Sequence, residues 1–170
     1  SDSDIDVIVN SKLTSIAISL DSYDAKMHDS IRGVTGAFDR TTNVIKKLTK
    51  RTPHKLSTTC TLTSINCYPE VVEKILHFNM ELGVRAVSFQ LTSPVGRCAE
   101  ERDLLPNKSQ WNDTFLWLTE NKKNIDGLDY VINPTNEGDA FWEYYFPLKQ
   151  TNKLELLKEV WNQDIENAQG

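Results

Sequence analysis

Cysteine is scarce in this sequence, and its spacing excludes two classes of structure. The three cysteines, Cys60, Cys67 and Cys98, form an odd set at wide intervals. Such a set does not build the disulfide framework of a small secreted domain, and it is typical of a reducing compartment. No pair has Cys-x-x-Cys spacing, so the cysteines predict no metal site. We expect Cys60 and Cys67 to be inert thiols, and for Cys98, in a loop after Gly96-Arg97, we disfavour the alternative of a cluster ligand.

Long apolar runs and an excess of basic residues are also absent. Val7–Val9 and Ile16–Ile18 are typical of the apolar runs, whereas a membrane span needs about 20 residues. The acidic stretch Ser1–Asp6 does not have the basic and apolar regions of a signal peptide. The net charge of −5 argues against a nucleic-acid partner, because phosphate binding requires a basic surface. We therefore expect a cytoplasmic protein with no membrane or nucleic-acid partner.

The residues that are present alternate between strand-like and helix-like segments. Apolar and β-branched residues predict strands at Leu13–Leu20, Lys55–Leu62, Arg85–Leu91 and Leu128–Ile132. Helical spacing predicts helices at Ala37–Arg51, Pro69–Leu82, Ser109–Lys122, Ala140–Phe146 and Asn152–Asn162. We predict that Ser109 caps its helix and that residues 21–36 form an irregular loop. Ile5–Leu13 fits a hairpin arm or the tail of a helix, of which we prefer the helix.

This alternation predicts an α/β fold. Strands separated by helices form right-handed βαβ units, which place the strands in a parallel sheet. Three or four strands do not close a barrel. We therefore expect one arc of a partial (β/α)6 TIM-like barrel, incomplete in this chain.

Polar residues gather where each predicted strand ends, which is where parallel α/β sheets bind ligands. They are Ser19, Asp21, Ser22, Thr61, Thr63, Asn66, Gln90, Thr92 and Ser93. Such a rim suits a polar ligand with ribose hydroxyls and charged amino-acid ends. Arg32 follows soon enough after the first strand to fold back over this rim, where its guanidinium could clamp a carboxylate through two hydrogen bonds.

Three of the polar residues also have simple structural roles open to them. Asp21 is predicted to cap the turn that follows it. His28 is predicted to brace its loop through a nearby hydrogen bond rather than to act as a base or ligand. Asn66 is predicted to cap, or to turn into, the helix that begins near Pro69.

Four segments in order resemble radical S-adenosylmethionine (SAM) enzymes. They are SLDSYDAKMHDSIRGVTGAFD (19–39), TLTSIN (61–66), ELGVRAVSFQLTSPVGR (81–97) and LPNKSQWNDTFLWL (105–118). They are similar to the fourth, fifth and sixth strands of that barrel and the next helix. The resemblance covers Leu13–Lys122 and is closest to the maturases that carry a C-terminal SPASM extension. Each motif is weak alone, and the order of the four gives the resemblance its specificity.

The resemblance implies a SAM-binding role for four residues. Ser19 would hydrogen-bond the methionyl end of SAM, and Arg32 would pair with its carboxylate. Gln90 and Leu91 would lie where the family contacts ribose and adenine. The parent enzyme would cleave SAM reductively at a [4Fe–4S] cluster, take electrons from a donor, and modify a peptide or a small-molecule cofactor precursor.

One departure from the family pattern decides which part of the barrel we expect this chain to contain. The C-x3-C-x2-C motif that binds the cluster is absent from the sequence. We therefore expect residues 1–125 to be the C-terminal half of the barrel and residues 126–170 to begin an extension toward a SPASM-like region. The cluster ligands would lie outside this chain, which alone would be inactive. Two alternatives stay open: a non-catalytic barrel module that binds a partner or precursor peptide, and an unrelated (β/α)-barrel enzyme.

Overall fold

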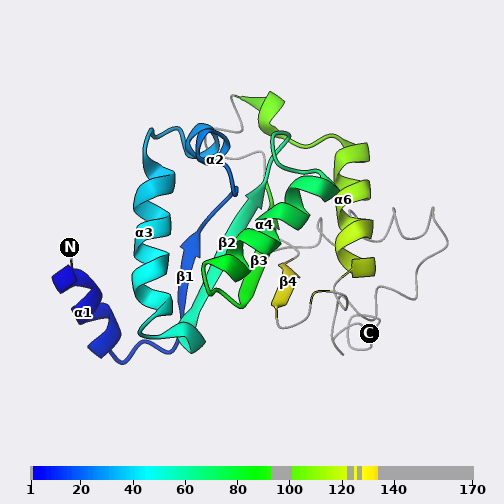
Figure 1. Cartoon of the computed structure of the whole chain (residues 1–170). Helices are drawn as coiled ribbons and strands as arrows, with labels where there is room; N and C mark the ends of the chain where they lie inside the picture. The colour runs from blue at the N-terminus through cyan, green and yellow to red at the C-terminus, as the bar shows by residue number, and fades with distance from the viewer. Residues whose placement is uncertain (1, 93–100, 122–124, 126–127, 134–170) are drawn as a thin grey trace, which may run out of the picture.

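In the part of the chain that the structure describes, the sheet has four strands, all parallel to their neighbours (Figure 1). The computed structural model describes residues 2–92, 101–121, 125 and 128–133. In these ranges the strands are β1 (Ile16–Ser19), β2 (Leu56–Leu62), β3 (Ala86–Leu91) and β4 (Asp129–Asn133), in that spatial order. The predicted parallel α/β arc is confirmed, including its fourth strand. Most of the predicted extension, residues 126–170, lies outside the described residues.

Helices connect the parallel strands, as crossover connections require. The described elements are α1 (Asp2–Asn10), α2 (Ala25–Arg32), α3 (Ala37–Thr49), α4 (Pro69–Glu81), α6 (Lys108–Asn121), and the short 3-10 turns η1 (Pro53–Lys55) and η2 (Arg102–Leu104). α3 lies between β1 and β2 in the chain, α4 between β2 and β3, and α6 between β3 and β4. No helix in the described ranges is long and apolar enough to span a membrane.

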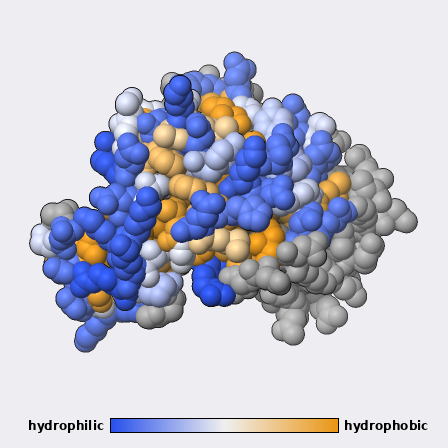
Figure 2. Space-filling view, in the orientation of Figure 1, coloured by the Kyte–Doolittle hydropathy of each residue, from blue (hydrophilic) through white to orange (hydrophobic). Residues whose placement is uncertain are grey.

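The two faces of the sheet differ in chemistry. In β2, Leu56, Thr58, Cys60 and Leu62 are buried, and the residues between them are only partly buried. This alternation follows from the two-residue period of a strand. The buried face packs against α4 and α6 in one apolar cluster and against α1 and α3 in another. Seen from the helix side, the outer helix surfaces are largely hydrophilic and hydrophobic residues lie in the seams between them (Figure 2).

The N-terminal segment is a helix, as preferred from the sequence. α1 buries Ile5 in the cluster that contains Ile45 and Leu48 of α3. Two ion pairs join the exposed surfaces of the helices, and in each the nitrogen and oxygen are 2.5 Å apart: Lys47 with Asp2, and Arg51 with Asp6. Exposed pairs of this kind contribute little on their own, so the buried isoleucine is the main anchor of α1.

The stretch predicted as an irregular loop contains α2, so that prediction is wrong in part. The Asp24 side chain caps the helix by accepting a hydrogen bond from the Met27 amide, and Gly33 ends it with a φ of 68°. The helix was missed because only His28 and Ile31 are buried, which leaves no apolar repeat to recognise. The signals that could have found it are the Asp24 cap and the Gly33 stop.

The N-cap of α6 is also different from the prediction. Asn107, not Ser109, closes the first turn. The Asn107 side chain accepts from the Gln110 amide at 2.9 Å, and the Gln110 side chain accepts from the Asn107 amide at 2.9 Å. This reciprocal pair satisfies two backbone donors, as a capping box does. Ser109 instead donates to the Asp113 carboxylate of the next turn.

A buried hydrogen bond under α4 gives a test of the packing. The Thr58 hydroxyl donates to Asn79 Oδ1 at 2.7 Å, and Asn79 Nδ2 donates to the Ile75 carbonyl at 2.8 Å. Thr58→Val keeps the side-chain shape but leaves Asn79 Oδ1 without that donor. We expect the intact protein to lose about 1–3 kcal/mol of unfolding free energy, measured by chemical denaturation.

Thr59→Val is the matched control for this measurement. Thr59 lies next in the same strand on the opposite, partly buried face. We expect this change to alter stability by less than about 0.5 kcal/mol. Equal losses in the two variants would contradict a specific role for the Thr58–Asn79 bond.

Candidate functional site

A buried carboxylate lies at the carboxyl end of the sheet. Asp21 follows β1 by two residues and is fully buried, which is rare for an acidic side chain unless it is paired. Its Oδ1 accepts a hydrogen bond from the backbone N–H of Thr61 at 2.9 Å. Its Oδ2 forms an ion pair with Nε of Arg32 at 2.5 Å. Asp21 therefore joins the end of β2 to the end of α2.

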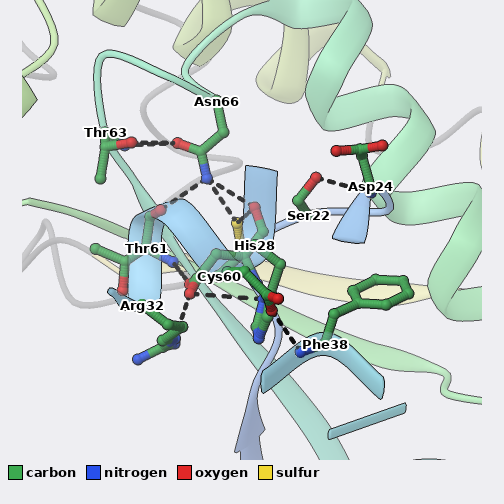
Figure 3. A network of polar contacts seen from close by, with 11 residues as sticks. Ser22, Asp24, His28, Arg32, Phe38, Cys60, Thr61, Thr63 and Asn66 are labelled. Atoms are coloured by element: carbon green, nitrogen blue, oxygen red, sulfur yellow. Dashed lines mark hydrogen bonds and ion pairs between the residues drawn. The ribbon is translucent and has the colours of Figure 1, made fainter. Parts of the chain in front are cut away.

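The backbone of Asp21 is held as firmly as its side chain. Its N–H donates to Nδ1 of His28 at 3.1 Å, and its carbonyl accepts from Nδ2 of Asn66 at 2.8 Å. The contacts come from α2 and from the end of β2 with the loop that follows it. Figure 3 shows this network, with His28, Asn66 and Thr61 converging from these separate segments.

These contacts correct the prediction for Asp21. We expected it to cap the following turn, but its carboxylate reaches across to β2 and α2 instead. The turn is closed by its neighbours: Ser22 Oγ accepts from the Asp24 amide, and Asp24 caps α2. The Asp24 cap was not predicted from the sequence, and only the fold shows that Asp21 is buried.

Asn66 ties together the ends of two strands. Its amide group donates to the Thr61 carbonyl at 2.9 Å as well as to Asp21, and its Oδ1 accepts from the Thr63 amide at 2.6 Å. α4 begins at Pro69 without a side-chain cap. Asn66 therefore does not cap that helix, and of its two predicted roles the turn into the helix is the one that holds. Asn66 shapes the turn after β2 and fixes it to the turn after β1.

His28 has the bracing role predicted for it, but from a helix rather than a loop. Its Nδ1 accepts the Asp21 N–H, which requires the neutral ring with its proton on Nε2. The ring is buried and lies edge-on to Phe38 at 5.9 Å between centroids. Burial lowers the pKa of His28, and this outweighs the opposite effect of Asp21. His28 therefore adds no positive charge beside Arg32.

A second aspartate fixes the direction of α2. Oδ2 and Oδ1 of Asp29 accept from the backbone N–H groups of Gly36 and Phe38 at 2.5 and 2.8 Å. These donors lie at the start of α3, and their hydrogen bonds lower the pKa of Asp29. The junction of α2 and α3 is thus closed by one side chain. α2, whose last residue is Arg32, is therefore fixed at its start by the Asp24 cap and at its end by Asp29.

The four residues predicted to bind SAM are placed as follows. Ser19 is the exposed last residue of β1, and Arg32 lies at the same edge of the sheet because of its pair with Asp21. The Arg32 side chain is 34% exposed. Gln90 is partly buried on β3, opposite Thr61 of β2. Leu91 packs against the apolar cluster on the helix side.

A row of hydroxyl groups runs across β1, β2 and β3 on the face away from the helices. Ser19 pairs with Thr59, and Thr59 pairs with Ser88. Side chains at paired positions of neighbouring strands point to the same face. Thr61 and Gln90 form the next pair toward the carboxyl edge. Thr59 and Ser88 were missed from the sequence, although the alternation in their strands could have placed them on the same face as Ser19.

The described residues do not form a metal site. Across the described ranges, no three His, Cys, Asp or Glu side chains are grouped so that they could hold a metal ion. Cys60 and Cys67 are buried free thiols. Burial raises the pKa of Cys60 well above its ordinary value and that of Cys67 to about 11, so both stay protonated, as inert thiols do. These residues do not fit an iron–sulfur cluster. Cys98 lies outside the described residues.

Comparison with known proteins gives one informative similarity. No family model matches the chain. Over 109 residues the chain is 29% identical to an AdoMet-dependent heme synthase of Methanosarcina barkeri (strain Fusaro / DSM 804). The match covers 64% of this chain and 30% of that protein, so the chain spans under a third of its relative. AdoMet is SAM, so the similarity supports the radical SAM resemblance in general and leaves the SPASM subgroup a prediction.

The buried state of His28 predicts a pH dependence of stability. Its folded-state pKa lies below the ordinary 6.5, so the unfolded chain takes up a proton first as the pH falls. We expect the unfolding free energy to fall as the pH drops below 6.5, by at most about 1.4 kcal/mol per pH unit from this group. The loss ends once the pH is below the folded-state pKa.

His28→Gln isolates this contribution, because glutamine does not titrate. The variant should show a shallower loss of stability as the pH falls below 6.5 in denaturation experiments on the intact protein. His77→Gln is the matched control for the replacement of a histidine by glutamine, because His77 is exposed on α4. Identical pH profiles for wild type and His28→Gln would contradict the assignment of His28 as a buried neutral ring.

Proposed function

We propose that this chain belongs to a radical SAM enzyme and supplies residues that bind the amino-acid end of SAM. The observation that carries the proposal is the placement of Arg32. Its guanidinium is anchored by a buried carboxylate at the carboxyl edge of a parallel sheet, and the side chain stays partly exposed there. Ligands of parallel α/β sheets bind at this edge. The similarity to an AdoMet-dependent enzyme supports the same ligand.

Each residue would hold a different part of the ligand. Arg32 is proposed to pair with the carboxylate of SAM, because a guanidinium matches a carboxylate through two parallel hydrogen bonds. The exposed Ser19 hydroxyl is proposed to bond the same methionyl end. Gln90 and Leu91 are proposed to lie near the ribose and adenine. Since the Leu91 side chain packs into the core cluster, its contact would come from the backbone.

The reaction of the whole protein extends beyond these residues. Bound SAM, together with a [4Fe–4S] cluster whose ligands lie outside this chain, would supply the hydrogen-abstracting chemistry. The role of the described residues is to bind and orient SAM at its end remote from the cluster. We propose a peptide or cofactor precursor as substrate, a SPASM-type maturase as the subgroup, a separate electron donor as partner and the cytoplasm as location.

SAM binding to the intact protein tests the proposal. Arg32→Gln removes the cation that faces the carboxylate, and we expect SAM affinity to fall by about tenfold or more in equilibrium dialysis. Ser19→Ala removes one neutral hydrogen bond and should weaken binding by about two- to tenfold.

Arg85→Gln provides the matched control. Arg85 is an exposed arginine that directly precedes β3, at the opposite edge of the sheet. Its replacement should leave SAM affinity unchanged. If Arg32→Gln binds SAM as well as Arg85→Gln does, the assignment of Arg32 is wrong. If the intact wild-type protein binds no SAM, the non-catalytic module becomes the better hypothesis.

A further inference from the structure

We propose that Asp21 is a positioning residue, which holds Arg32 by Nε so that its two terminal nitrogens are left to bind a ligand carboxylate. This inference rests on the proposed function and deepens it, because it names what gives the site its preference for a carboxylate. Neither the sequence resemblance nor the similarity to the heme synthase assigns a role to Asp21.

The contact between Asp21 and Arg32 uses one part of the guanidinium. The ion pair joins Asp21 Oδ2 to Nε, the nitrogen within the side chain. Asp21 is the only ionic partner of Arg32 in the described part of the chain. Figure 3 shows the end of the Arg32 side chain directed away from Asn66 and Cys60. A guanidinium carries five N–H donors in a planar fork, so a carboxylate at Nε leaves the terminal nitrogens for a second carboxylate.

Asp21 is built to resist displacement. Its Oδ1 accepts from the Thr61 amide, its N–H donates to His28, and its carbonyl accepts from Asn66. The carboxylate therefore cannot turn without breaking a bond to the Thr61 amide. Asp21 is fully buried, whereas the Arg32 side chain is one-third exposed. We therefore infer that Asp21 stays in place and sets the orientation of the arginine.

The charges around Arg32 make the orientation of its N–H groups more important for ligand binding than net electrostatic attraction. The Asp21–Arg32 pair has no net charge, and the nearby His28 ring is neutral. Asp29 uses its oxygens on the start of α3 and does not contact the arginine through any described hydrogen bond or ion pair. A ligand carboxylate thus meets a neutral pair rather than an isolated cation. Its binding depends on the direction of the free N–H groups, which Asp21 sets.

The Asp21→Asn variant separates positioning from charge. The amide oxygen is needed to accept the Thr61 N–H, so the amide nitrogen would face Nε of Arg32. Two N–H groups repel, and Arg32 is released while its charge remains. The readout is the ratio of affinities for SAM and for decarboxylated SAM, measured by equilibrium dialysis on the intact protein. We expect Asp21→Asn to lower this ratio by about tenfold.

A stability control and a second variant make the test decisive. Thr58→Val, which also removes a buried hydrogen bond but on the helix side of the sheet, should leave the ratio unchanged. Arg32→Lys keeps the charge but has a single ammonium in place of the fork, and it should lose the preference as Asp21→Asn does. If Asp21→Asn does not fold, Arg32→Lys decides: a lysine variant with the wild-type ratio overturns the proposal.

The double variant Asp21→Asn/Arg32→Gln completes the set. If Asp21 acts through Arg32, adding Asp21→Asn to Arg32→Gln should change the ratio by less than about twofold. One outcome would contradict the positioning role and leave the proposed function standing. In that outcome wild type prefers SAM, Arg32→Gln loses the preference, and a folded Asp21→Asn retains it. If wild type shows no preference between the two ligands, the proposed function itself fails.

Discussion

The ion pair between the buried Asp21 carboxylate and Arg32 is the constraint on which the candidate site depends. A carboxylate in an apolar interior is strongly unfavourable unless its oxygens are paired. Asp21 meets this requirement with partners from two different segments, and those partners fix the relative positions of β1, β2 and α2. The arrangement of residues at this edge of the sheet therefore depends on the hydrogen bond and ion pair that the Asp21 carboxylate requires when it is buried. The apolar clusters on the helix side hold the layers together, but they do not determine where Arg32 lies.

The parallel sheet explains why these groups meet at all. Asp21 and Asn66 are far apart in the chain, yet both follow strands that run in the same direction. Parallel strands end at one edge, so the turns after them become neighbours. The same geometry aligns Ser19, Thr59 and Ser88 in a row on the face away from the helices. A ligand at this edge would meet hydroxyl groups along the sheet and an arginine above it, both supplied by the topology.

The sequence predicted the layers of this fold better than the contacts within it. Strands with buried alternate residues and helices with apolar repeats have periodic patterns, so β2, β3, α3 and α4 were found to within about two residues. α2 has no such pattern, because its residues mostly serve polar contacts. The sequence also predicted that Ser19 and Arg32 lie at one edge of the sheet, because Ser19 ends a strand and only a short connection separates it from Arg32. That Asp21 is buried and bonded to Thr61 and Asn66 depends on contacts across 40 and 45 residues, which local propensity does not encode.

The small net contribution of the Asp21–Arg32 ion pair to stability indicates what role the pair has. Burying a charged pair contributes little net stability, because the loss of hydration offsets most of the attraction, and a well-packed apolar pair is often as stable. The Asp21–Arg32 pair is also asymmetric, with one partner fully buried and the other 34% exposed. The asymmetry has a clear effect on direction: it fixes the base of the guanidinium and leaves its outer end accessible at the edge where parallel sheets bind ligands. We therefore interpret the buried carboxylate as part of the proposed binding site, although it would not touch the ligand.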